Sequence, residues 1–219
     1  LDGRELLCSQ HLPTWHAPGV RSSVRLEDLA AARGIPHLAH RAFGDVQATV
    51  QLLGATSPIT GAPYFALDCE WADTLASELV SLALVPDDPA LPEFYAERLI
   101  LPRSPTPFVA AVVYPLLTRG RAAMSDVDIA DGLRSYLASF DDPVVMHDTG
   151  VDLMLLQDTL ADSRATVPYP RFRTHLIGVP GYVQRIEGIF SRDLALRQQR
   201  HHALIDARVA REAFRACVR

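Results

Sequence analysis

Two acidic residues, Asp68 and Glu70, lie within the apolar stretch Phe65-Ala-Leu-Asp-Cys-Glu-Trp71. The stretch follows the turn-rich segment 54–63, and its length and composition predict a short buried β-strand. Alternate side chains of a strand share a face, so Asp68 and Glu70 point one way and Cys69 points the other way. Two carboxylates on one apolar face repel each other, and a hard divalent cation between them relieves that repulsion. The alternative is a pair of acids at the exposed end of a strand, because such short patterns are common.

A second group of candidate residues comprises His147 and Asp152, which lie where the predicted strand 143–147 ends and the predicted helix 151–161 begins. Catalytic side chains of α/β proteins collect at such strand ends. A carboxylate in the first turn of a helix also complements the helix dipole, and that role alone would explain Asp152. The position is therefore a candidate that needs support from elsewhere in the chain.

The third group, His201 and Asp206, lies at the start of the last predicted helix, 202–218. Five residues of a helix span ~500°, so the two side chains do not share one helix face. If His201 lies just before the helix, however, both side chains reach one point at its N-terminus. A histidine beside a metal-binding aspartate suits proton abstraction from water. The alternative is that His201 and His202 only cap the helix.

The composition is that of a globular chain with an uneven charge distribution. The chain has 219 residues, of which 48% are hydrophobic, and this is enough for one good core. The net charge of −5 combines 17 acids and 5 arginines in residues 60–163 with 4 acids and 11 arginines in residues 164–219. An acidic middle can hold metal and an arginine-rich end can hold phosphate, although a solvated helix face explains part of the arginine excess.

The cysteines and the apolar runs narrow the cellular setting. Cys8, Cys69 and Cys217 are far apart and form no CxxC pair, which argues against a disulfide framework or a zinc site and suits a reducing cytoplasm. No apolar run approaches the ~18 residues of a membrane span. The start, Leu1-Asp-Gly-Arg4, lacks both a methionine and a signal peptide, so we expect a piece of a longer chain or a processed chain.

The remaining pattern predicts an α/β fold with a mixed central sheet. Three strands come first and are expected to form an antiparallel meander, and helices and strands then alternate. Ser125 is predicted to cap one of the helices. The predicted strands are 65–71, 78–85, 93–100, 143–147 and 172–177, and the predicted helices are 24–33, 40–53, 126–140, 151–161 and 202–218, with a broken helical segment at 108–117 and irregular or short helical structure over 181–200.

Taken together, Asp68-x-Glu70, the His147-x4-Asp152 frame and the His201-x4-Asp206 frame resemble the DEDDh group of 3′–5′ exonucleases over residues 64–218. The segments FYAE at 94–97, FVAAVVYPLL at 108–117 and HHALIDAR at 201–208 are similar to the small bacterial exoribonuclease AS family, whose members can trim poly(A) tails. Trp71 departs from the Phe or Thr that relatives often carry, and it could alter how a terminal base stacks.

The resemblance implies a ribonuclease H-like fold with flanking helices and a site that hydrolyses single-stranded nucleic acid from its 3′ end, with RNA favoured, to nucleoside 5′-monophosphates. Two divalent cations, Mg²⁺ or Mn²⁺, would be held by the acidic residues, with His201 as general base. A homodimer is a further expectation, since many relatives dimerise. A DNA-trimming or proofreading exonuclease and a catalytically silent nucleic-acid-binding module are the alternatives. The implied ligands are Asp68, Glu70, Asp152 and Asp206, and the implied substrate-binding residues are Cys69, Trp71, Glu78, His147, Arg200 and Arg208.

The N-terminal part of the chain repeats one of these motifs. His40-x4-Asp45 lies 161 residues before His201-x4-Asp206, which is about one domain length. We therefore interpret residues 1–53 as the tail of a preceding proofreading-type exonuclease domain, residues 54–63 as a linker and residues 64–219 as the DEDDh exonuclease domain. No acid pair precedes His40, so residues 1–53 hold no complete site, and a helical hairpin with a chance histidine is the alternative.

Overall fold

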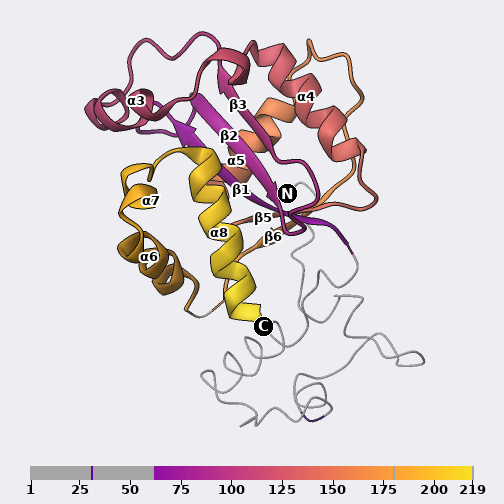
Figure 1. The fold of residues 1–219 in the computed structure, drawn as a ribbon. Helices are drawn as coiled ribbons and strands as arrows, with labels where there is room; N and C mark the ends of the chain where they lie inside the picture. Colours follow the sequence, from indigo (N-terminus) through magenta and orange to yellow (C-terminus); the bar gives the residue numbers. More distant parts are fainter. Residues whose placement is uncertain (1–30, 32–61, 180, 219) are drawn as a thin grey trace, which may run out of the picture. The chain divides into compact units, whose positions relative to one another are not determined.

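The computed structural model describes residues 31, 62–179 and 181–218 (Figure 1). Residues Gly61–Ala216 form one compact unit. The predicted helices at 24–33 and 40–53 and most of the linker lie outside the described residues, except that Ala31 is helical. Among the described residues, no helix is both long and apolar enough to cross a membrane.

Within the described part of the chain, the strands form one six-stranded mixed sheet of order β4-β3-β2-β1-β5-β6 (Figure 1). The first three strands pair antiparallel, as the sequence predicts, while β5 runs parallel to β1, β6 to β5 and β4 to β3. The α/β class with a mixed sheet is therefore confirmed. The strands are β1 (Tyr64–Trp71), β2 (Leu79–Pro86), β3 (Phe94–Arg98), β4 (Ala123–Met124), β5 (Val144–His147) and β6 (Arg173–Leu176).

The helices cover both faces of this sheet. In the view of Figure 1, α8 lies across the front of the sheet and α5 lies behind it. The rear face is the main core, in which leucines of β1 and β2 pack against leucines of α4 and α5. On the front face, Ala83 and Val85 of β2 meet Ala203 and Ala207 of α8, and these small side chains let the helix lie close to the sheet. The helices are α3 (Tyr114–Leu116), α4 (Asp126–Ala138), α5 (Gly150–Leu160), α6 (Tyr182–Arg192), α7 (Leu194–Gln198) and α8 (Ala203–Val218), with single-turn helices η3 (Val109–Val113) and η4 (Gly120–Ala122).

The alternation predicted for β1 is present and decides which of its side chains lie on the front and the rear face of the sheet. Phe65, Leu67 and Cys69 belong to the rear core. Asp68 and Glu70 therefore point to the front face, toward the side covered by α8. The predicted N-cap is also confirmed, because the Ser125 hydroxyl accepts a hydrogen bond from the backbone N–H of Asp128 at the start of α4.

One local prediction, the break at Pro115, was wrong. Pro115 does not break a helix, because helical structure runs without a gap from η3 into α3, with a π-turn in which the N–H of Tyr114 bonds the carbonyl oxygen of Val109. The short helical structure predicted within residues 181–200 is present as two helices, of which α7 begins where the Asp193 carboxylate accepts a hydrogen bond from the N–H of Leu196. On α5, Leu155, Leu156 and Leu160 are buried against the sheet.

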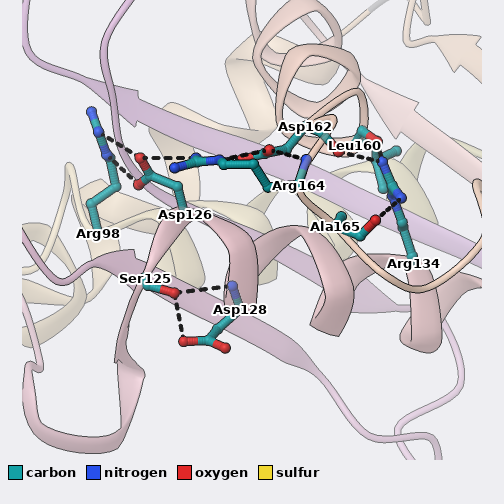
Figure 2. Close-up of polar contacts among 9 residues, drawn as sticks. All are labelled: Arg98, Ser125, Asp126, Asp128, Arg134, Leu160, Asp162, Arg164 and Ala165. Atoms are coloured by element: carbon teal, nitrogen blue, oxygen red, sulfur yellow. Dashed lines mark hydrogen bonds and ion pairs between the residues drawn. The ribbon is translucent and has the colours of Figure 1, made fainter.

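The loop between α5 and β6 is held by side chains of α4 (Figure 2). The guanidinium of Arg134 is buried and donates hydrogen bonds to backbone carbonyl oxygens on both sides of the loop, including those of Asp162 at 2.9 Å and Val167 at 2.6 Å. Asp131 accepts hydrogen bonds from the backbone N–H groups of Thr166 and Val167 at 2.7 and 2.8 Å. This loop leads into β6, so α4 helps to fix the edge of the sheet.

We expect Arg134→Met to destabilise the protein by roughly 2–4 kcal/mol, because a buried cation and its hydrogen bonds to several carbonyls are lost together. Arg134→Lys should lose less, since an ammonium retains the charge but cannot reach every carbonyl. Arg164→Met is the matched control, because Arg164 lies in the same loop but pairs with Asp162 at the exposed surface. Urea unfolding measures all three variants, and equal stability of Arg134→Met and Arg164→Met would contradict the role assigned to Arg134.

Candidate active site

A cleft of about 450 Å³ opens at the end of β1. It brings together all five residues that the sequence proposed as catalytic: two from β1, one from the first turn of α5 and two from the start of α8. The cleft is lined by Asp68, Cys69, Glu70, Trp71, Asp73, Thr74, Thr106, Phe108, Val109, Asp148, Thr149, Asp152, His201 and Asp206. Residues far apart in the chain therefore converge, because the C-terminal end of the central strand β1 and the starts of α5 and α8 lie next to one another.

Asp152 connects α5 to β1. It is only 3% exposed, and its Oδ1 accepts a hydrogen bond from the backbone N–H of Cys69 at 3.1 Å. Its Oδ2 accepts a hydrogen bond from the hydroxyl of Thr149, and that hydroxyl in turn accepts one from the backbone N–H of Asp152 at 3.3 Å. The carboxylate is thus fixed in orientation by the strand and by the helix cap.

His201 lies just before α8 and has a left-handed backbone conformation, with φ of 74°. Its backbone N–H donates a hydrogen bond to Oδ2 of Asp206 at 3.0 Å. Ligand atoms of Glu70, His201 and Asp206 lie within 4.8 Å of one another. The imidazole also packs edge-on against the ring of Phe108, with centroids 4.9 Å apart. The sequence analysis required His201 to lie just before the helix if it is to meet Asp206 at the helix N-terminus. The structure places His201 there.

The carboxylates of the cleft are crowded and poorly solvated. Burial, and then the charges of Asp206 and Asp152, raises the pKa of Glu70 to about 8. Burial raises the pKa of Asp152 and of Asp206 to about 6. The pKa of Asp68 lies well above its ordinary value, because the side chain is buried and because the charges of its acidic neighbours oppose its ionisation.

Two buried carboxylate oxygens in the cleft are placed where a cation could bind them. Among the described residues, Oδ2 of Asp68 and Oδ1 of Asp206 are buried and have no hydrogen-bond partner. Hard divalent cations take carboxylate oxygens as ligands. A bound cation therefore offsets the free-energy cost of burying these charged oxygens without a hydrogen-bond partner. The donor set therefore fits a divalent cation. Burial, and then the nearby Arg200 charge, lowers the pKa of His201, so its imidazole is held in the neutral, proton-accepting form at neutral pH.

Four residues that the sequence proposed for substrate binding do not line the cleft. His147 is buried, and its Nδ1 lies 2.7 Å from the carbonyl oxygen of Thr149. Arg200 pairs with Glu187, and Arg208 pairs with Glu93. The side chain of Glu78 likewise does not line the cleft. Being next to a motif in the sequence did not determine the direction of these side chains.

The structure adds cleft residues that the sequence reasoning missed. Asp148 is a further carboxylate in the cleft, and its charge adds to the crowding of Asp68, Asp152 and Asp206. Thr149 was recognisable in principle, since the pattern Thr-x-x-Asp before an apolar run is a helix-capping signal. Phe108 had no such signal, because its approach to His201 depends on the path of the chain between β3 and α4.

Comparisons with protein-family models, with curated proteins and with solved structures find no match to this chain. The fold and the site define an α/β protein with a carboxylate-rich cleft, suited to a divalent cation, and a neutral histidine beside it.

The raised pKa values predict how stability depends on pH in the metal-free protein. The folded state holds these protons more tightly than the unfolded chain, in which carboxylates titrate near pH ~4. The free energy of unfolding should therefore fall as the pH rises from about 4 to about 8, the pKa of Glu70. Thermal unfolding with EDTA present measures this, and a midpoint that rises over this range would contradict the crowding of charge.

A carboxylate-to-amide variant separates crowding from general effects of pH. Asp68→Asn should raise the metal-free unfolding midpoint at pH 8 and have little effect at pH 5, because the neutral amide removes one charge from the cluster. Asp141→Asn, at an exposed position outside the cleft, is the control and should change neither value. Mn²⁺ at about 100 times its Kd should stabilise the wild type by about 2.7 kcal/mol and stabilise Asp68→Asn less at the same concentration.

Proposed function

We propose that this chain is a two-metal-dependent 3′–5′ exonuclease of the DEDDh group, with a ribonuclease H-like fold, that releases nucleoside 5′-monophosphates with RNA favoured over DNA. The observation that carries the proposal is the convergence of Asp68, Glu70, Asp152, Asp206 and His201 in one cleft. These are the residues on which the resemblance to that group rests. A catalytically silent binding module would have no reason to retain a crowded acidic cluster with a neutral histidine beside it.

The residues divide the chemistry between them. Two divalent cations, when bound, supply electrophilic stabilisation of the scissile phosphate and lower the pKa of a water molecule. The carboxylates of Asp68 and Asp206 present unpartnered oxygens to hold cations. The neutral imidazole of His201 takes the proton of the attacking water. The new bond joins the water oxygen to phosphorus, and the bond from phosphorus to the 3′-oxygen of the remaining strand breaks. That oxygen takes a proton from solvent to give a 3′-hydroxyl, and the terminal nucleotide leaves with its 5′-phosphate.

Aromatic side chains in the cleft support a nucleic-acid end as the substrate. Trp71 and Phe108 both line the cleft, and Phe108 is half exposed. Stacking of a terminal base on such a ring is tolerant of sequence and contributes about 1–3 kcal/mol per base. The preference for RNA is supported by the resemblance of segments 108–117 and 201–208, which supply Phe108, Val109, His201 and Asp206 to the cleft. The homodimer, the cytoplasmic location and the assignment of residues 1–53 to a preceding domain stay predictions.

The deciding experiment is digestion of matched single-stranded ribo- and deoxyribo-oligonucleotides, labelled at the 5′ end, with Mg²⁺, Mn²⁺ or EDTA. We expect a ladder that shortens from the 3′ end, mononucleotide 5′-phosphates as products, faster loss of the RNA and no reaction with EDTA. Because the 2′-hydroxyl is the only difference between the sugars, the ratio of rates measures RNA preference directly. Faster digestion of DNA would favour the DNA-trimming alternative, and no cleavage of either strand with metal that is shown to bind would favour the binding module.

His201→Ala should lower kcat on the order of 10²–10⁴-fold, the usual loss when a general base is removed. Metal affinity by calorimetry should change little, because the four carboxylates remain. The fall in rate toward acid pH, where the imidazole is protonated, should disappear from the pH–rate profile. Asp206→Ala should abolish cleavage together with metal binding. His202→Ala should cost far less than His201→Ala, and the reverse order would show that the base is wrongly assigned.

A further inference from the structure

A buried carboxylate on β3 organises the chain next to His201. Glu97 is completely buried, and its oxygens accept hydrogen bonds from the hydroxyl of Tyr95 at 2.6 Å and from the backbone N–H groups of Thr118 and Arg119 at 2.6 and 3.0 Å. A buried carboxylate is tolerated only where donors satisfy it. Glu97 thereby fixes the backbone at Thr118 and Arg119, which connect α3 to η4.

This connection is held in a strained conformation. Arg119 has a φ of 57°, which is unfavourable for a residue with a side chain. Its guanidinium donates hydrogen bonds to the carbonyl oxygens of Arg98 at 2.9 Å and Leu99 at 2.8 Å. Strain of this kind persists only where the surroundings over-determine the backbone, and it concentrates at functional sites. The bonds around Arg119 therefore hold Thr118 in one place.

Thr118 also contacts the residue that directly precedes α8. Its Oγ1 lies 3.1 Å from Nε2 of His202, a hydrogen bond across 84 residues of sequence. The His202 ring is 8% exposed and stacks on the ring of Tyr95, with centroids 4.8 Å apart. His202 is thus anchored in the interior, whereas His201, the residue before it, has its left-handed φ of 74° and turns into the cleft.

The same segment also contacts His201 directly. Phe108, which packs edge-on against the His201 ring, precedes η3, and Thr118 follows α3, so one segment of helical turns touches His201 at one end and His202 at the other. Two adjacent histidines that point in different directions are held by one element that β3 itself fixes. This arrangement leaves the His201 imidazole little freedom to leave the cleft.

We propose that Thr118 and His202 are positioning residues that hold the His201 imidazole over the carboxylate cluster; the inference rests on the proposed function, in which His201 takes a proton from water. Proton transfer requires the base to lie within hydrogen-bond reach of that water. A small displacement of a reacting group costs a large factor in rate. Loss of the hydrogen bond between Thr118 and His202 therefore lowers turnover and leaves substrate binding in place.

The test compares Thr118→Val, which keeps the shape and removes the hydroxyl, with Thr118→Ser, which keeps the hydroxyl. Thr118→Val should lower kcat by on the order of tenfold, the effect of one net hydrogen bond, with KM and Mn²⁺ affinity within about twofold of wild type. Thr118→Ser should restore kcat to within about twofold of wild type. If Thr118→Val lowers only the unfolding temperature and keeps kcat well below that temperature, the role of the pair is structural and the proposal fails. Thr118→Ala repeats the test should the valine variant not fold.

A readout that needs no catalysis separates this proposal from the proposed function. In the Mg²⁺-loaded protein with labelled histidine and phenylalanine, the rings of His201 and Phe108 should give a nuclear Overhauser contact in the wild type and in Thr118→Ser. The contact should weaken severalfold in Thr118→Val. If the wild type cleaves no oligonucleotide, the proposed function fails, while this comparison still decides whether the pair orients His201. An unchanged contact in Thr118→Val overturns the positioning role.

Discussion

The mutual repulsion of carboxylates at the end of β1 is the constraint on which the site depends. Asp68 and Glu70 are forced onto one face by strand alternation, and Asp206 and Asp152 reach them from two helix starts. Burial and like charge raise the pKa of all four groups, so the metal-free cleft opposes folding when these groups ionise. A bound cation would convert this penalty into a gain, because whatever binds the folded state alone stabilises it.

The rest of the fold offsets that penalty on the opposite face of the sheet. The rear core is made almost entirely of leucine, phenylalanine and other apolar side chains from β1, β2, α4 and α5. Arg134 secures the loop that leads to β6, and the Asp152 carboxylate gains hydrogen bonds from β1 and from the cap of α5. The apolar face of β1 thus supplies stability, and its polar face supplies the site. Separating the two faces lets one short strand do both.

The sequence predicted this separation because it depends only on local periodicity. The alternation around Asp68 and Glu70, the cap at Ser125 and the antiparallel order of the first three strands all follow from short-range patterns, and the structure has them. The directions of the side chains of Arg200 and Arg208 depend on partners distant in sequence, Glu187 and Glu93, which no local pattern reveals. β4 was missed because two residues carry no period, and Phe108 because its contact with His201 is made entirely by tertiary packing.

The pairing register links the carboxylate cluster to the network that holds the histidines. Glu70 on β1 lies beside Ser81 on β2, and Ser81 lies beside Glu97 on β3, so one row of polar residues crosses three strands. At one end of the row Glu70 faces His201, and at the other Glu97 fixes Thr118, which bonds His202. The hydrogen bonds of the sheet therefore connect the carboxylate cluster to the pair of Thr118 and His202. In the proposed reaction, proton transfer to His201 would be sensitive to small displacements, and the paired strands β1, β2 and β3 hold the residues around it in one register.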